Sequence, residues 1–250
     1  MRRKIVAGNW KMNTNVAEGV CLAKDVVAKL NEVPQDVDLI IAPPFTHLVS
    51  VADAIKGTKV GLSAQNCADE VKGAYTGEVS VAMLQSAGCK YTILGHSERR
   101  QYYGETSAKL VKKMHLALEA GISPIFCVGE MKEERLANKH FDVVEAQIKE
   151  VLFELSAEEV ANVVIAYEPV WAIGSGKAAT PADAQEVCHL IREKVAKLMS
   201  PEIARKIRIL YGGSVNEKNA ASFSFGDIDG VLVGGASLKV DAFAEIARSF

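Results

Sequence analysis

The sequence has little of what marks a disulfide-bonded, zinc-binding or membrane protein. Its five cysteines are odd in number and widely spaced, and no two form a CxxC pair. This argues against a disulfide framework or a zinc site and favours reduced thiols in a cytoplasmic compartment. We expect Cys21, Cys89 and Cys188 in the core, and Cys127 to pack rather than to act as a nucleophile. No stretch approaches the ~18 apolar residues of a spanning helix, and the N-terminal apolar run is too short for a signal peptide.

An excess of charge of one sign is also missing. The chain has 29 Lys and Arg against 31 Asp and Glu, a formal net charge of -2, with no long run of either sign. Composition therefore indicates neither nucleic acid nor an acidic membrane surface as a partner. Any anionic substrate has to be held by local groups.

The chain does contain a regular alternation of strand-like and helix-like segments. Short β-rich runs occupy 4–8, 37–42, 60–65, 91–95, 122–128, 163–167, 207–211 and 230–233. Stretches with helical spacing occupy 16–30, 46–55, 106–119, 143–155, 182–199 and 241–248. Eight such units predict an α/β fold, one (β/α)8 barrel domain of parallel strands spanning residues 1–250. An open doubly wound sheet is the alternative, but it usually has a Gly-rich turn after its first strand, and residues 8–11 lack that pattern.

In such a barrel the functional residues gather in the loops after the strands. A buried apolar strand that delivers one carboxylate, Glu168, beside a Gly-rich loop can place a catalytic base under a lid; the alternative is a strand that ends at a solvated acid. We expect Ser97 to cap a helix, so that His96 lies at the helix's positive end, which favours the neutral ring. The Gly-Gly turns at 212–213 and 234–235 expose N–H groups suited to phosphate, or are ordinary tight turns.

Each of these residues also has a purely structural explanation when taken alone. Lys11 can be a solvated loop lysine, and His96 a structural histidine at a strand end. Residues 174–179 nominally fit GxGxxA, but no acidic residue follows about 20 positions on, so dinucleotide binding is not expected. The absence of HExxH, acidic clusters and paired Cys and His predicts no metal site.

Eight motifs, in order, resemble those of the triosephosphate isomerase family. They are GNWKMN (8–13), QN (65–66), GAYTGE (73–78), LGHSERR (94–100), CVGE (127–130), AYEPVWAIGSGK (166–177), YGGSV (211–215) and LVGGASL (232–238). The resemblance covers essentially the whole chain and departs at Ser175, where Thr is more frequent, and at Tyr75. It implies a TIM barrel and an isomerase of glycolysis and gluconeogenesis. Such an enzyme interconverts dihydroxyacetone phosphate and D-glyceraldehyde 3-phosphate through an enediol(ate), without cofactor or metal.

The resemblance also implies roles for the strand-end residues. Glu168 is the base, His96 the electrophile that shuttles protons between oxygens, and Lys11 with Asn9 supplies charge and orientation. Glu98 organises Lys11 and His96. Backbone N–H groups hold the phosphate, at Gly174, Ser214, Gly234 and Gly235.

A lid and a dimer are implied in the same way. The lid covers 169–179. Its two hinges are Pro169-Val170-Trp171 and Lys177-Ala178-Ala179. Between the hinges lie Ala172, Ile173, Gly174, Ser175 and Gly176. Tyr211 and Ser214 latch it. The segment 65–79 resembles the interdigitating loop of a homodimer; its tip, Tyr75-Thr76-Gly77, approaches Asn9 and Lys11 of the partner. The alternative is a solvated loop.

Two other functions stay open at this level. One is another phosphate-binding barrel enzyme, such as a Schiff-base aldolase, which needs a reactive lysine where this chain has Glu168. The other is a non-catalytic scaffold of the same fold. The joint presence of Lys11, His96 and Glu168 argues against a scaffold.

Overall fold

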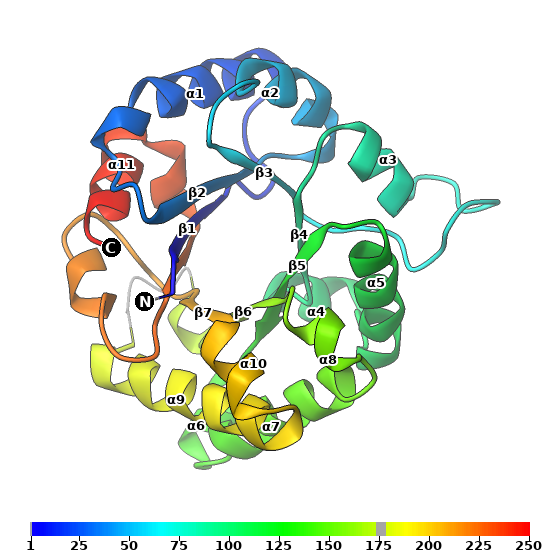
Figure 1. Cartoon of the computed structure of the whole chain (residues 1–250), viewed down its shortest axis with the longest axis vertical. Helices are drawn as coiled ribbons and strands as arrows, with labels where there is room; N and C mark the ends of the chain where they lie inside the picture. Colours follow the sequence, from blue (N-terminus) through cyan, green and yellow to red (C-terminus); the bar gives the residue numbers. More distant parts are fainter. Residues whose placement is uncertain (1, 174–178) are drawn as a thin grey trace.

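Eight parallel strands close into a barrel in the computed structural model, which describes residues 2–173 and 179–250 (Figure 1). The strands are β1 Lys4–Asn9, β2 Val37–Ala42, β3 Gly61–Ala64, β4 Tyr91–Leu94, β5 Ser123–Val128, β6 Val164–Tyr167, β7 Arg208–Tyr211 and β8 Gly230–Val233. Each strand pairs with the next along the chain, and β8 pairs back with β1. The predicted (β/α)8 barrel is confirmed, and each predicted strand boundary coincides with the observed one or lies beside it.

Helices surround the barrel on its outside (Figure 1). Those that correspond to predicted helical stretches are α1 Val16–Ala28, α2 Leu48–Ala54, α5 Ser107–Glu119, α7 His140–Leu152, α9 Pro181–Leu198 and α11 Val240–Arg248. Sequence reasoning missed the shorter α3 Val81–Ser86, α6 Lys132–Leu136, α8 Ala157–Val160 and α10 Pro201–Lys206. Fewer than two helical turns show too little periodicity to be recognised.

Local signals in the sequence explain where the long helices begin. At α1, the Asn15 side chain accepts the Glu18 N–H at 3.0 Å, and the Glu18 carboxylate accepts the Asn15 N–H at 2.9 Å. The same reciprocal pair, Thr180 and Asp183, begins α9, with Pro181 in the first turn, where its missing N–H has no intrahelical partner to lose. The helix α9 therefore starts directly after the segment predicted to be the lid.

Apolar side chains fill two layers, one inside the barrel and one between strands and helices. The inner layer consists of Ile5, Ala7, Ile40, Ala42, Ile93, Ile125, Cys127, Val164, Ala166, Leu210 and Leu232. Strands buried on both faces read as unbroken apolar runs, which is why their positions could be predicted. Cys89, Cys127 and Cys188 are buried as expected, but Cys21 is exposed on α1, so its assignment to the core is wrong. Within the described ranges, no helix is long and apolar enough to cross a membrane.

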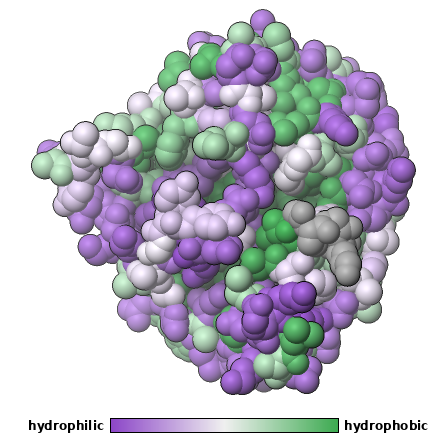
Figure 2. Space-filling view, turned by 180° about the vertical axis from the view of Figure 1, so that it is seen from behind, coloured by the Kyte–Doolittle hydropathy of each residue, from purple (hydrophilic) through white to green (hydrophobic). Residues whose placement is uncertain are grey.

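The face opposite the one in Figure 1 carries a hollow in which hydrophobic residues lie among hydrophilic ones (Figure 2). A long arm projects from the side of the barrel between β3 and α3; it is drawn in cyan in Figure 1. This arm is the segment 65–79, predicted to be the dimer loop, and Tyr75 on it is half exposed.

Candidate active site

A cavity of about 360 Å³ lies at the C-terminal ends of the strands. Its lining comes from the loops after β1, β4, β6, β7 and β8: Asn9, Lys11, Asn13, His96, Glu168, Ile173, Gly212, Gly213, Ser214, Val215, Leu232, Gly234, Gly235 and Leu238. The structure thus brings seven of the predicted catalytic and phosphate-binding residues to one cavity, together with Ile173 of the predicted lid: Asn9, Lys11, His96, Glu168, Ser214, Gly234 and Gly235. The predictions for Gly174, Ser175, Gly176, Lys177 and Ala178 lie outside the described residues.

Glu168 follows β6 directly and is almost fully buried. Its backbone N–H donates to the Val128 carbonyl of β5 at 2.7 Å, which continues the sheet ladder by one residue. One carboxylate oxygen, Oε1, lies 3.1 Å from Nε2 of His96, and the other accepts the Ser97 N–H at 3.1 Å. Burial alone would raise the pKa of Glu168. At the acid pH where this carboxyl titrates, His96 is a cation, and its charge and hydrogen bond, with the Ser97 N–H, lower the pKa. The group is therefore a buried, ionised carboxylate at the edge of the cavity.

His96 caps α4 (Ser97–Tyr103), with its Nδ1 accepting the Glu98 N–H at 3.2 Å. The expectation that Ser97 caps this helix is wrong, because Ser97 is already its first helical residue. A nitrogen that accepts a hydrogen bond carries no proton, so this bond assigns the neutral tautomer with the proton on Nε2. Burial also favours the neutral ring, while the nearby Glu168 charge acts in the opposite direction and raises the pKa of His96. The Nε2–H group points at Glu168 and, with it, at the cavity.

Lys11, which lines the cavity, forms an ion pair with Glu98, with Nζ and Oε1 2.5 Å apart. Lys11 has a left-handed backbone, φ 53°, which Asn9 supports by accepting the Lys11 N–H at 3.0 Å. Gln65 at the end of β3 donates to the Lys11 carbonyl at 2.9 Å. Because Glu98 also donates its N–H to His96, it connects the cation and the imidazole, the arrangement that the sequence implied.

The turn after β7 needs glycine at 212 and 213 because neighbouring atoms leave no room there for a Cβ. A Cβ on Gly212 would lie 2.8 Å from Cγ of Glu168, and one on Gly213 would lie 2.0 Å from the Tyr211 hydroxyl. The turn therefore brings backbone, rather than side chains, to the cavity wall. The loop after β8 adds Gly234 and Gly235, the latter at the start of a short 3-10 helix. Exposed N–H groups of this kind suit an anion.

Both ends of the predicted lid form hydrogen bonds with residues at the ends of the barrel strands. At the first end, the Trp171 indole donates to the buried Glu130 carboxylate at 2.7 Å. At the second end, the Ala179 N–H donates to the Tyr211 hydroxyl at 3.2 Å. The Ser214 hydroxyl donates to the Ala172 carbonyl at 2.6 Å. These contacts place the two predicted latch residues against the described parts of the lid.

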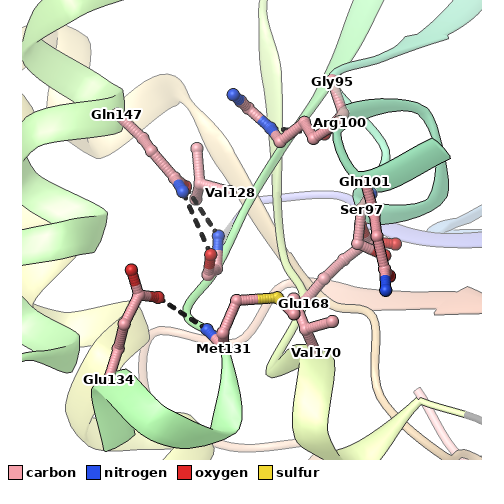
Figure 3. Close-up of a pocket in the computed structure, with 11 residues that line it drawn as sticks. Gly95, Ser97, Arg100, Gln101, Val128, Met131, Glu134, Gln147, Glu168 and Val170 are labelled. Carbon is pink, nitrogen blue, oxygen red and sulfur yellow. Dashed lines mark hydrogen bonds between the residues drawn. The ribbon is translucent and has the colours of Figure 1, made fainter. Parts of the chain in front are cut away.

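A second cavity, of about 320 Å³, also has Glu168 in its lining (Figure 3). Val128, Met131 and Val170 contribute apolar lining, and Gln147 reaches into the wall from α7. Glu168 lines both cavities, so its side chain forms part of the boundary between them.

Three residues that hold the site together received no role from the sequence. Glu130 accepts from Trp171 and from the Tyr167 hydroxyl. Gln147 bonds both backbone groups of Gly129, a contact that joins α7 to the loop after β5. Arg100 links the ends of β4 and β5 by donating to two backbone carbonyls. The motifs CVGE and LGHSERR contain Glu130 and Arg100, but Gln147 lies on a helix whose spacing gives no sign of this contact.

Comparison with known proteins places the chain among isomerases. The family model described as Triosephosphate isomerase matches residues 4–250. A protein of Porphyromonas gingivalis named triosephosphate isomerase is 54% identical over 251 residues, covering 100% of both chains. Proteins of the same name from Bacteroides fragilis (54%, 100% of both chains) and Carboxydothermus hydrogenoformans (50%, 99% of both chains) are also similar.

Proposed function

The chain belongs to the triosephosphate isomerase family, and we propose that the cavity at the strand ends performs the family's reaction with Glu168 as the base. The protein interconverts dihydroxyacetone phosphate and D-glyceraldehyde 3-phosphate, a reaction of glycolysis and gluconeogenesis. One observation supports the assignment of roles above all others. A buried carboxylate that its neighbours keep ionised lies 3.1 Å from a neutral imidazole donor, and both line one cavity with Lys11.

The reaction moves a proton between two adjacent carbons, and each step needs a different group. The ionised Glu168 removes a proton from the first carbon and returns it to the second. Nε2–H of His96 donates a hydrogen bond to the substrate oxygens as negative charge develops on them, and it exchanges protons between them. The Lys11 ammonium adds a fixed positive charge near the same oxygens, oriented by Asn9 and Glu98. The same base acts in both directions, so the chemistry needs no cofactor.

The phosphate group occupies the other side of the cavity in this proposal. Backbone N–H groups of Ser214, Gly234 and Gly235 bind it, and Gly174 completes the set when the lid closes. Closure excludes water and protects the enediol(ate) from losing its phosphate. Contacts of Tyr211 with Ala179 and of Ser214 with Ala172 stabilise the lid.

We also propose that the active form is a homodimer in the cytoplasm. The strained backbone of Lys11 costs about 1–3 kcal/mol, which surrounding contacts have to offset. Its neighbour Met12 is 94% exposed in the isolated chain. A partner's projecting arm, with its tip at Tyr75-Thr76-Gly77, would cover Met12 and hold Lys11 in its active conformation.

The test is a coupled assay with both triose phosphates on wild type, Glu168→Gln and Glu133→Gln. Removing a general base lowers turnover by about 10²–10⁴-fold, so Glu168→Gln should lose kcat to that extent. It should still bind a phosphate-bearing enediolate mimic. Glu133 is exposed on α6, so its identical substitution should leave kcat unchanged. A Glu168→Gln variant with near-wild-type kcat would show that another group is the base.

A Schiff-base aldolase mechanism predicts a covalent lysine adduct with the same substrates. Borohydride reduction in the presence of dihydroxyacetone phosphate should give no change in protein mass, because Lys11 acts only as a charge in the proposal. A stable adduct on Lys11 would support the aldolase instead.

A further inference from the structure

The end of the barrel opposite the substrate cavity carries a cluster of cations. A shallow hollow of about 560 Å³ lies there, lined by Arg2, Arg3, Ala161, Arg205, Lys206 and Arg208. We call its five cationic residues the basic mouth. They come from the segment before β1, the last turn of α10 and the start of β7, close to the N-terminal label and α10 in Figure 1. No carboxylate is among the lining residues.

Carboxylates beside the hollow pair with its first two cations. Arg3 pairs with Asp38 and Arg2 with Asp229, each at 2.7 Å. Asp229 is shared, because Arg192 also binds it at 2.6 Å. Arg192 also pairs with Asp227 at 2.5 Å, so this edge of the mouth has one carboxylate for each guanidinium group, and the unpaired charge lies on the other cations.

The other three cations have weaker partners or none. Arg205 pairs with Glu202 one turn earlier on α10, but both side chains are about two-thirds exposed, so this pair contributes little. Over residues 2–173 and 179–250, no carboxylate lies within 4.0 Å of the charged atoms of Lys206 or Arg208. These two charges are left for a ligand.

Arg208 also has a buried hydrogen-bond donor without an acceptor. Its Nε is enclosed and makes no hydrogen bond within the described part of the chain. Leu210, two positions later on β7, belongs to the inner layer of the barrel, so Arg208 points to the same interior side. A buried N–H without an acceptor is costly, and the Arg208 guanidinium would gain an acceptor by turning toward an anion in the hollow.

We propose that the basic mouth binds an oligophosphate, a chain of linked phosphate groups such as tripolyphosphate or the triphosphate of a nucleotide. Guanidinium groups match phosphate oxygens in pairs, and three cations without a strong carboxylate partner around one hollow suit an anion with several charges better than a single phosphate. The only lining residue without a charge is Ala161, so the hollow offers no aromatic surface for a base. The phosphate chain, and not the nucleoside, is what the mouth recognises.

The experiment is an NMR titration of the full-length protein with tripolyphosphate at low ionic strength, following backbone amides. Signals of 205, 206 and 208 report the basic mouth, and those of 234–235 report the substrate cavity, so the two phosphate sites are read separately. The double variant Arg205→Gln with Lys206→Gln, both exposed, should weaken binding at the mouth by about tenfold or more while the isomerase activity stays unchanged. Arg208→Gln should weaken it similarly.

The control removes the same charge elsewhere, by Lys24→Gln with Lys109→Gln, both exposed on other helices. It should leave the affinity within about twofold of wild type, because an added charge at that distance is screened. ATP and tripolyphosphate should bind equally well, and orthophosphate much more weakly. Equal losses of tripolyphosphate affinity in both double variants would overturn the proposal. So would the absence of amide chemical-shift changes at 205–208. A much higher affinity for ATP would overturn recognition by the phosphate chain alone.

Discussion

The side-chain amide of Gln147 bonds both backbone groups of Gly129. Gln147 Oε1 accepts the Gly129 N–H at 2.8 Å, and its Nε2 donates to the Gly129 carbonyl at 3.1 Å (Figure 3). Gly129 in turn lies against the backbone of Glu168, where a Cβ would come within 1.8 Å of the Glu168 carbonyl oxygen. The amide on α7 therefore fixes the peptide against which the proposed base is seated.

Gln147→Met is expected to lower kcat by about 10- to 100-fold, because small displacements of a catalytic group are that costly. Methionine has similar volume but no amide, so both bonds to Gly129 are lost. KM should change little, since Gln147 does not line the substrate cavity. Steady-state kinetics checks this, with thermal unfolding to confirm the fold.

Gln147→Glu separates the two bonds, because a carboxylate accepts the Gly129 N–H but cannot donate to its carbonyl. Its kcat should lie between those of wild type and Gln147→Met. Gln85→Glu is the control, since the Gln85 amide also donates to a backbone carbonyl, that of Ala120, at a position that does not line the site. A raised KM with an unchanged kcat would contradict a positioning role for Gln147.

The sequence alone located the strands and most of the cavity, because both follow local rules. Strands buried on two faces read as apolar runs, and Asn9, His96 and Glu168 each come directly after or at the end of such a run. Gln147 could not be found in this way. Its contact with Gly129 depends on how α7 packs on β5, which spans 18 residues of sequence and has no local pattern.

The prediction of the residue that caps α4 was wrong for a related reason. Ser97 is the more frequent capping residue type, so propensity favoured it over His96. In the fold, the His96 ring is held between Glu168 and the Glu98 N–H, and this tertiary arrangement decides the cap. The tertiary contacts of His96 therefore outweigh the capping propensity of Ser97.

The pH dependence of stability should report the lowered pKa of Glu168. Its folded-state pKa lies below the ordinary 4.5. The charged form therefore stabilises the fold above pH 4.5, and this contribution is lost as the pH falls through the folded-state pKa. As the pH falls below about 4.5, wild type should lose unfolding free energy relative to Glu168→Gln. Urea unfolding of both proteins at several pH values measures this difference.

Glu133→Gln should follow wild type over the same pH range, because Glu133 is exposed and lies on α6. If wild type and Glu168→Gln instead lose stability in parallel below pH 4.5, the ion-pair environment described for Glu168 is wrong.

Tyr211→Phe is expected to lower kcat and to release more inorganic phosphate per turnover. The Ala179 N–H is buried and donates to the Tyr211 hydroxyl at 3.2 Å. Without the hydroxyl that donor is unpaired, at a cost of about 1–3 kcal/mol, which corresponds to a roughly 5- to 150-fold lower population of the closed lid. Phosphate release during turnover measures how often the enediol(ate) escapes protection.

Tyr91→Phe is a matched control for this prediction, because Tyr91 begins β4, at the end of the strands opposite the cavity, and does not line it. Its kcat and phosphate release should equal those of wild type. An unchanged product ratio in Tyr211→Phe would mean that the hydroxyl does not latch the lid.

Exposed apolar side chains on the loops after the first four strands favour a partner there. Among them are Met12 after β1, Tyr75 after β3, and Tyr102 and Tyr103 on α4. Large apolar groups gathered on successive loops at one end of a barrel are typical of an interface. The double variant Met12→Asp with Tyr75→Asp should therefore sediment as a monomer, while wild type sediments as a dimer.

The monomer should lose kcat by about 100-fold, because Lys11 then lacks the contacts that hold its left-handed backbone in place. Leu136→Asp is the control: this residue is 75% exposed at the end of α6, away from those loops, and should stay dimeric and active. Sedimentation velocity and activity are measured over the same dilution series. A monomer with full activity would contradict the homodimer as the functional unit, since the cavity would then be complete within one chain.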